Sequence, residues 1–310
     1  MFDPAAITAA IAAHGPVARV VIAAVAGSSP REVGAAMLVW PQGQSGTIGG
    51  GALEFQAAAR ARDMLTTSTR QHLTREALGP DLGQCCGGTV TLLTEVFDAH
   101  SVPQTAVFAR PTGGTPMPLA VSRLLAKARG QGGIPQPCLL QGWMIEPIAK
   151  PNRPVWVWGA GHVGRALVTT LAPLPDLAIT WVDVAADRFP TTVPDGVTVL
   201  TAIDPARLMP HAPQNAEHLI LTYSHTLDLA LCHAALTTGF GHCGLIGSKT
   251  KWARFRNRLA ALGHTPASIA RITCPIGDPS LGKHPQAIAI GVAAKLLQPQ
   301  SLMSQQKAAL

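Results

Sequence analysis

The stretch Trp158-Gly-Ala-Gly-His-Val-Gly-Arg165 decides how the second half of this chain folds. It places glycines at 159, 161 and 164, directly after an apolar run over 155–158 and at the start of an expected helix over 163–171. In this arrangement the first glycine permits a tight turn, the second lets the backbone approach a phosphate, and the third lets the helix pack closely on the strand. The segment therefore predicts a strand, a glycine loop and a helix whose N-terminus can receive an anion.

Short apolar runs alternate with helical patterns through the rest of this half. The expected strands cover 178–182, 197–201, 218–222 and 243–246, and the expected last helix covers 285–297. Such alternation is typical of a Rossmann-like, doubly wound parallel sheet with helices on both faces. Asp183 follows the second strand, where a dinucleotide-binding protein places its ribose-binding carboxylate. Nucleotide binding and a purely structural role for the glycines both stay open.

Three more residues of this half are candidates for contacts with an anion. His162 lies inside the glycine loop, where a protonated imidazole would donate a charge-assisted hydrogen bond to a phosphate. Ser248 and Lys249 follow the strand that ends at Ile246, so Ser248 could cap the next helix while Lys249 reaches an anion. Helix capping alone also explains Ser248, and a surface position also explains His162.

The first half begins with an expected helix over 4–14, because Asp3 and Pro4 favour a helix start and Gly15 favours its end. Strands are expected over 17–26 and 35–40. A loop of three glycines, Gly49, Gly50 and Gly51, then leads into a helix over 52–64. Glu54 lies in its first turn. Its carboxylate could bind ring nitrogens of a heterocyclic ligand, or it could complement the helix dipole.

Two adjacent cysteines, Cys85 and Cys86, stand between glycines in the run Gly83-Gln-Cys-Cys-Gly-Gly88, before an expected strand over 89–97. Ordinary disulfide geometry separates the two α-carbons by more than one peptide unit, so these thiols are poorly placed to bridge each other. The glycines remove side-chain bulk and let a ligand approach the sulfurs. A soft metal or a sulfur transfer would suit such thiols. The alternative is a pair of small buried side chains at the start of the strand.

Prolines and glycines recur between 101 and 153, around one expected helix over 119–129. We interpret this segment as a connecting region with some local structure. The predicted organisation is an N-terminal α/β domain over 1–100, the connecting region over 101–153, a Rossmann-like domain over 154–297 and a flexible tail over 298–310.

The composition narrows the classes of partner. The 310 residues are 47% hydrophobic and 13% charged, with a net charge of +7, which favours an anionic ligand or an acidic partner. Aromatic residues make up 5% and no helix-turn-helix signature occurs, so nucleic acid is not expected. Neither a signal peptide nor a bilayer-spanning segment is expected from the sequence. The six cysteines form no CxxC pair, which fits reduced thiols in the cytoplasm. No catalytic residue is assigned, because no nucleophile-base-acid series, HExxH motif or Walker lysine occurs.

Both halves together resemble the XdhC/CoxI family, the accessory proteins that mature xanthine dehydrogenase and related molybdenum hydroxylases. The resemblance covers nearly the whole chain, and the order of its motifs makes it specific. It rests on Gly27-Ser-Ser-Pro-Arg31, Ile48-Gly-Gly-Gly-Ala-Leu-Glu54, Gly83-Gln-Cys-Cys-Gly-Gly88, Trp158-Gly-Ala-Gly-His-Val-Gly164, Gly247-Ser-Lys249, Cys274-Pro-Ile-Gly277 and His284-Pro-Gln-Ala-Ile288.

The resemblance implies a protein that is not an enzyme but a chaperone of the molybdenum cofactor. Such a protein holds the cofactor while a cysteine desulfurase exchanges an oxo ligand for sulfur, and then delivers it to the apo xanthine dehydrogenase molybdenum subunit. More distant relatives keep a single Cys-Gly-Gly that matches Cys86, so Cys86 comes before Cys85 as the expected molybdenum contact. A homo-oligomer is expected, because the client is itself oligomeric.

The expected cofactor-binding residues are Cys85, Cys86, Gly49, Gly50, Gly51, Glu54, Gly159, Gly161, His162, Gly164, Ser248 and Lys249. Two other functions stay open from the residues themselves. The glycine loop of the second half would also suit an NAD(P)-dependent oxidoreductase. The cysteines would also suit a sulfurtransferase that carries a persulfide.

Overall fold

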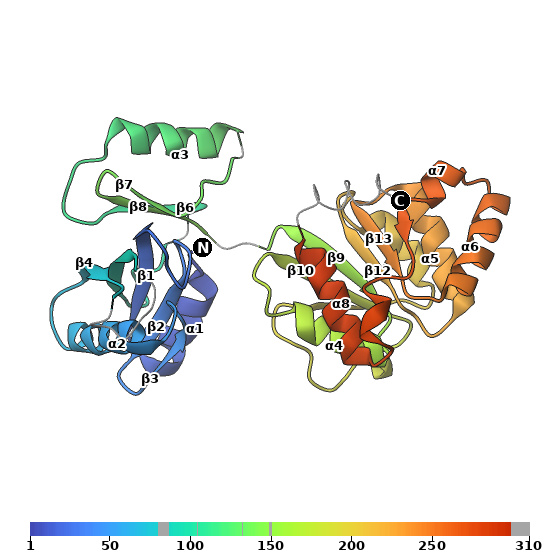
Figure 1. Ribbon diagram of the computed structural model, residues 1–310, viewed down its shortest axis with the longest axis horizontal. Helices are drawn as coiled ribbons and strands as arrows, with labels where there is room; N and C mark the ends of the chain where they lie inside the picture. The colour runs from blue at the N-terminus through green and yellow to red at the C-terminus, as the bar shows by residue number, and fades with distance from the viewer. Residues whose placement is uncertain (80–86, 104, 132, 149–150, 299–310) are drawn as a thin grey trace. The chain divides into compact units, whose positions relative to one another are not determined.

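The computed structural model describes residues 1–79, 87–103, 105–131, 133–148 and 151–298. The chain divides into two compact units, Met1–Ala149 (unit 1) and Lys150–Leu310 (unit 2), as Figure 1 shows. Cys85 and Cys86 lie outside the described residues, and so does the expected tail from 299 onward. None of the helices in the described ranges combines the length and the apolarity that a bilayer crossing requires.

The main sheet of unit 1 has five strands in the order β3-β2-β1-β5-β4, and each neighbouring pair is antiparallel. The strands are β1 (Val17–Ala26), β2 (Ala36–Trp40), β3 (Gly43–Gly46), β4 (Gln71–Ala77) and β5 (Thr89–Phe97). Helix α2 (Gly51–Leu65) packs on one face, where its small residues Ala57, Ala58 and Ala61 meet Val20 and Ile22 of β1. Helix α1 (Pro4–His14) has the bounds that the sequence predicts.

A second, three-stranded antiparallel sheet of unit 1 lies in the segment that we expected to be a connector. Its strands are β6 (Val107–Pro111), β7 (Cys138–Leu140) and β8 (Trp143–Pro147), in the order β6-β8-β7. Helix α3 (Leu119–Gln131) contributes Val121 to the apolar cluster around Trp143 and Ile145. From the other face of this sheet, Met144 packs with Val21 and Leu93 of the main sheet. The described residues between 105 and 148 therefore form a folded layer of unit 1, and its strands of three to five residues are too short to give a clear pattern in the sequence.

Four charged side chains are buried where the two sheets of unit 1 meet: Arg19 of β1, Glu95 of β5, Arg110 of β6 and Glu146 of β8. Glu146 accepts hydrogen bonds from both terminal nitrogens of Arg19, at 2.9 and 2.7 Å, and from Arg110 at 2.7 Å. Arg110 also forms an ion pair with Glu95. We call these four residues the buried charge cluster. Its ion pair between Arg19 and Glu146 connects the main sheet to the second sheet, although 127 residues of sequence separate these two residues.

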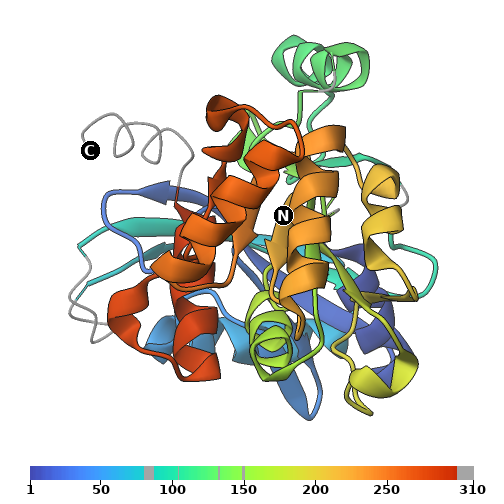
Figure 2. The same ribbon diagram turned by 90° about the vertical axis from the view of Figure 1, so that its right-hand side faces the viewer.

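Unit 2 contains one six-stranded parallel sheet in the order β11-β10-β9-β12-β13-β14. Its strands are β9 (Arg153–Trp158), β10 (Leu177–Asp183), β11 (Thr198–Thr201), β12 (Glu217–Ile220), β13 (His242–Leu245) and β14 (Ile272–Thr273). Helices α4 (His162–Leu171) and α8 (Pro285–Leu297) cover one face, and α5 (His225–Thr238) and α6 (Lys249–Ala261) cover the other, as Figures 1 and 2 show. Short helical segments are α7 (Pro266–Ile269), η2 (Ala186–Arg188), η3 (Pro205–His211) and η4 (Pro279–Leu281).

The alternation of side chains along β9 explains why both faces of this sheet carry helices. Val155 and Val157 belong to the apolar cluster under α4 and α8, whereas Trp156 and Trp158 belong to the cluster under α5 and α6. The predicted Rossmann-like, doubly wound sheet is confirmed. Its strand order reverses between β9 and β12, so the loops that follow these two strands flank the point where such sheets bind ligands.

Candidate functional site

Two of the three glycines in the loop between β9 and α4 are required by packing. A β-carbon on Gly159, whose φ is +119°, would lie 2.5 Å from the carbonyl oxygen of Leu221. A β-carbon on Gly164 would lie 2.0 Å from the carbonyl oxygen of Gly159. At Gly161 a β-carbon would meet nothing within 4 Å, and no side chain caps the helix that starts there. The N-terminus of α4 is thus open to a ligand, with exposed His162 as its first residue.

Asp183 lies beside this loop, at the end of β10, and is 4% exposed. Its carboxylate accepts hydrogen bonds from the backbone nitrogen of Ala160 at 2.5 Å and from that of Val184 at 2.7 Å. The side chain of Arg188 lies 3.5 Å away. Asp183 therefore braces the glycine loop, and both of its oxygens already have donors.

The loops after β12 and β13 contribute a polar cluster that the sequence analysis missed. Asp228 of α5 is fully buried and accepts hydrogen bonds from the hydroxyl of Thr222, at 2.7 Å, and from its backbone nitrogen, at 3.0 Å. Lys251 of α6 donates to Asp228 at 2.6 Å and to the carbonyl oxygen of Ile246 at 2.9 Å. The only signal in the sequence was an acidic residue in the first turn of a helix capped by Ser224.

The structure places Ser248 and Lys249 at the start of α6. The hydroxyl of Ser248 accepts a hydrogen bond from the backbone nitrogen of Lys251 at 3.1 Å, so Ser248 caps α6. Lys249 is exposed at the first position of that helix, and Lys251 is the lysine that reaches the edge of the sheet. Cys274 lies close by, and burial raises the pKa of its thiol to about 11. At neutral pH this thiol is protonated.

In unit 1 the side chain of Glu54 turns back onto the glycine loop that precedes it. One carboxylate oxygen accepts hydrogen bonds from the hydroxyl of Thr47 at 2.5 Å and from the backbone nitrogens of Ile48 and Gly50 at 3.0 Å each. Partial burial would raise the pKa of this carboxyl, but these hydrogen bonds outweigh burial and hold the pKa below its usual value. Glu54 therefore shapes the loop, and its second oxygen accepts from Gln44 at 3.1 Å.

The glycine-rich loops of unit 1 meet at one end of the main sheet. Gly49, Gly50 and Gly51 all have positive φ angles, and a β-carbon on Gly49 would lie 2.5 Å from the ring of Pro30. A β-carbon on Gly88, just before β5, would lie 2.1 Å from the carbonyl oxygen of Ser28. The loops over 27–31 and 47–51 and the glycine pair that follows Cys86 in the sequence are thus brought together, although they are up to 61 residues apart.

The predicted site residues therefore form two sets, one in each unit. Gly49, Gly50, Gly51 and Glu54 belong to unit 1, whereas Gly159, Gly161, His162, Gly164, Ser248 and Lys249 belong to unit 2. Cys85 and Cys86, the predicted molybdenum contacts, lie outside the described residues. Within the described residues, no group of three His, Cys, Asp or Glu side chains is placed to hold a metal ion.

The two units define a protein with a glycine-loop N-terminal domain followed by a Rossmann domain. The profile of the XdhC and CoxI family matches residues 10–75, and that of the XdhC Rossmann domain matches residues 155–296. The chain belongs to the XdhC and CoxI family.

Two known proteins show how far this similarity extends. The uncharacterized protein YqeB of Escherichia coli (strain K12) is 28% identical over 142 residues, which are 45% of this chain and 26% of YqeB. The aligned part thus spans about a quarter of that relative. The crystal structure of a xanthine dehydrogenase from Bacillus halodurans matches with a TM-score of 0.71 and 20% identity, over 96% of this chain and 95% of that one. At this identity the match shows that the whole fold is shared.

Proposed function

We propose that this protein is an accessory protein of xanthine dehydrogenase that binds the molybdenum cofactor, holds it during sulfuration and delivers it to the apo-enzyme. Membership of the XdhC and CoxI family supports the accessory role. The observation that carries the cofactor-binding part is the convergence of the glycine loops of unit 1. Close packing at Gly49 and Gly88 brings two family motifs, and the described Gly88 at the end of a third, to one end of the sheet.

The chemistry of the described loops fits such a ligand. The molybdenum cofactor presents a phosphate, a hydrogen-bonding pterin and a soft metal bound by sulfur. The open N-terminus of α4 at Gly161 suits a phosphate, because its free backbone N–H groups and the helix dipole favour negative charge. In unit 1, Glu54 holds the glycine loop in its turn, and the paired thiols Cys85 and Cys86 are the soft ligands that the proposal assigns to molybdenum or to the transferred sulfur.

An NAD(P)-dependent oxidoreductase is the second candidate, because the α4 loop also suits a dinucleotide. The burial of Asp183 argues against it. Asp183 is 4% exposed and accepts hydrogen bonds from two backbone nitrogens, so it serves to brace the loop and offers little accessible surface to a ribose. The proposed partners are the apo xanthine dehydrogenase molybdenum subunit and a cysteine desulfurase, and the proposed assembly is a homo-oligomer.

The test measures bound cofactor in protein purified from cells that can and cannot make it. We expect fluorescence of oxidised pterin and stoichiometric molybdenum only in the first preparation. Cys86→Ser should lower both signals at least about tenfold, a loss of about 1.4 kcal/mol of binding free energy. Cys138→Ser is the matched control, because Cys138 is a free, half-buried thiol of the same unit that lies in β7. Equal and negligible signals from both kinds of cell would refute the proposal.

The role of the α4 loop is tested separately with Gly161→Asp. The new side chain meets no atom within 4 Å of its β-carbon, so the fold should persist while a carboxylate repels the phosphate. We expect less pterin and an unchanged melting temperature. Tight NAD(H) binding that Gly161→Asp abolishes, in a protein without pterin, would favour the oxidoreductase instead. A persulfide that turns over in pterin-free protein would favour the sulfurtransferase.

A further inference from the structure

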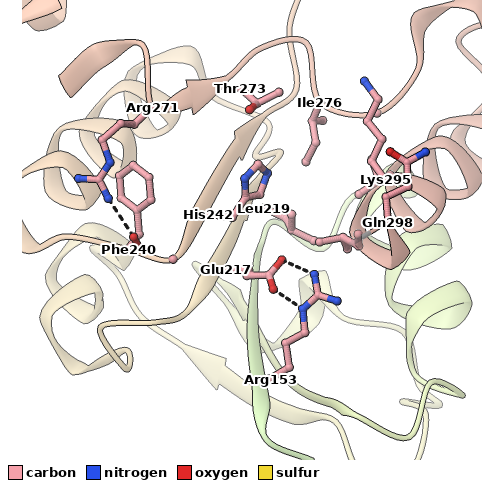
Figure 3. A pocket seen from close by; sticks show the side chains of 14 residues that line it. Arg153, Glu217, Leu219, Phe240, His242, Arg271, Thr273, Ile276, Lys295 and Gln298 are labelled. Carbon is pink, nitrogen blue, oxygen red and sulfur yellow. Dashed lines mark hydrogen bonds and ion pairs between the residues drawn. The ribbon is translucent and has the colours of Figure 1, made fainter. Parts of the chain in front are cut away.

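A cavity of about 300 Å³ opens in unit 2 at the amino-terminal ends of the parallel strands (Figure 3). Arg153 begins β9, Glu217 begins β12 and His242 begins β13, while Arg271 directly precedes β14. Doubly wound sheets usually bind their ligands at the carboxyl ends of the strands. The cavity therefore lies at the opposite end of the strands from the α4 glycine loop. The proposed function does not use it.

One wall of the cavity is apolar and closely packed. Leu219 of β12, Ile276, and Val292 and Leu296 of α8 line it, and none of them is more than 7% exposed. All four belong to the apolar cluster between the sheet and α8. The volume is at the lower end of the range that small-molecule sites occupy, so a compact organic body would fit against this wall.

The charged residues of the lining carry an excess of positive charge. Three cations, Arg153, Arg271 and Lys295, stand against one carboxylate, Glu217. Glu217 is 3% exposed, and Arg153 forms an ion pair with it through Nε and donates a second hydrogen bond at 2.9 Å. Because Arg153 neutralises Glu217, the charges of Arg271 and Lys295 remain for a ligand.

Arg271 is held in place but keeps most of its donors. One terminal nitrogen donates to the carbonyl oxygen of Phe240 at 3.0 Å, and the guanidinium carbon lies 4.4 Å from the centre of the Phe240 ring. The ammonium group of Lys295 makes no hydrogen bond or ion pair with any described residue, and it contributes only slightly, after the bonds from Ser280, to the lowered pKa of Asp278. Figure 3 shows Arg271 and Lys295 on opposite sides of the cavity, with His242 between them.

We infer that this cavity binds a small organic anion that carries one carboxylate or phosphate group on a compact apolar body. Arg271 binds the anionic group, because a guanidinium fork forms strong charge-assisted hydrogen bonds to such oxygens, and Lys295 on the other side of the cavity attracts the anion through its charge. Ile276 and Leu296, which keep 7% and 6% of their surface exposed, contact the apolar body. The site therefore recognises both the negative charge and the apolar body of a ligand, and tight binding requires both.

Three probes of similar size separate these contributions. Benzoate, phenyl phosphate and neutral benzamide are titrated into the full chain by calorimetry, with saturation-transfer NMR to detect weak binding. We expect at least one of the two anions to bind at least about tenfold more tightly than benzamide, and their order identifies the preferred anionic group. No binding of either anion at millimolar concentration, or binding no tighter than that of benzamide, would overturn the inference.

Variants then locate the binding. Arg271→Met should weaken binding of the anion about tenfold and leave benzamide unchanged. Lys295→Met should weaken it about threefold, because its charge acts from a distance, whereas Lys295→Arg should retain it. Lys283→Met is the control, because exposed Lys283 precedes α8 and the helix puts about 15 Å between Pro285 and Lys295. Unchanged anion binding in both variants, with melting temperatures like that of the wild type, would refute this site. None of these results depends on whether the chain binds a pterin.

Discussion

The buried charge cluster of unit 1 predicts a large and local effect of Glu146→Gln. Glu146 is fully buried and receives three hydrogen bonds from Arg19 and Arg110. Burial alone would raise the pKa of this carboxyl, but the two guanidinium groups outweigh burial and keep it ionised and its pKa low. Replacing the carboxylate with an amide of the same shape removes the negative charge. Arg19 and Arg110 then stay buried, and among the described residues only Glu95 still supplies the cluster with a carboxylate.

The size of the effect follows from the cost of breaking a buried ion pair. Removing one partner of such a pair costs about 3–5 kcal/mol, and we expect about 3 kcal/mol because the amide oxygen still accepts a hydrogen bond. This corresponds to an increase of about 100-fold in the population of the open state of unit 1. Hydrogen exchange detects it, because amides of β1 and β8 that exchange through this opening should exchange about 100-fold faster.

The same experiment contains its own controls. Amides of β9 and β12 in unit 2 should exchange at the wild-type rate, since no member of the cluster belongs to that unit. Glu32→Gln breaks an exposed ion pair with Arg31 and should change exchange by less than about fivefold. If β1 and β8 exchanged at wild-type rates in Glu146→Gln, the cluster would not stabilise the contact between the two sheets.

Two further predictions concern unit 2. Burial, with a smaller contribution from His242, lowers the pKa of His218 to about 4, so below pH 6.5 the unfolded chain takes up a proton that the folded chain does not. As the pH falls from 7 to 4, the free energy of unfolding should therefore decrease by about 3 kcal/mol more in the wild type than in His218→Gln. Urea unfolding at each pH measures this difference, and an equal decrease in the two proteins would contradict the prediction. Gly164→Ala should lower the stability of unit 2 by roughly 3 kcal/mol or more, because its β-carbon would lie 2.0 Å from a backbone oxygen, whereas Gly161→Ala should cost less than about 1 kcal/mol. Thermal unfolding of both variants compares them, and equal melting temperatures would refute the steric argument.

Local patterns in the sequence were sufficient to predict five of the six strands of unit 2, whereas the two-residue strand β14 is too short to give a pattern. The apolar run before Gly159 is buried on both faces of the sheet, and a strand in that position must be apolar throughout. The helix bounds Pro4–His14 and Pro285–Leu297 were also predictable, because proline, glycine and capping side chains act on their nearest neighbours. The two glycines that packing requires, Gly159 and Gly164, were recognisable for the same reason.

The predictions became less complete where a residue depends on distant partners. Glu54 stood in the correct first turn, and the sequence left open whether its carboxylate binds a ligand or complements the helix dipole. Its hydrogen bonds to Thr47, Ile48 and Gly50 of the preceding loop were not foreseen. Lys249 and Lys251 are equivalent as charges in the sequence. The helix that starts at Lys249 turns only Lys251 toward buried Asp228.

By itself, the sequence determined the family, the doubly wound sheet of unit 2 and the residues that shape its glycine loop, because each of these depends on short-range sterics and on the period of the apolar residues. Tertiary structure decided which loops meet at the end of the main sheet of unit 1, where the charged cluster joins its two sheets, and how Arg271 and Lys295 come to flank one cavity. Those arrangements join residues far apart in the chain. Long-range packing fixes them, and no local pattern records it.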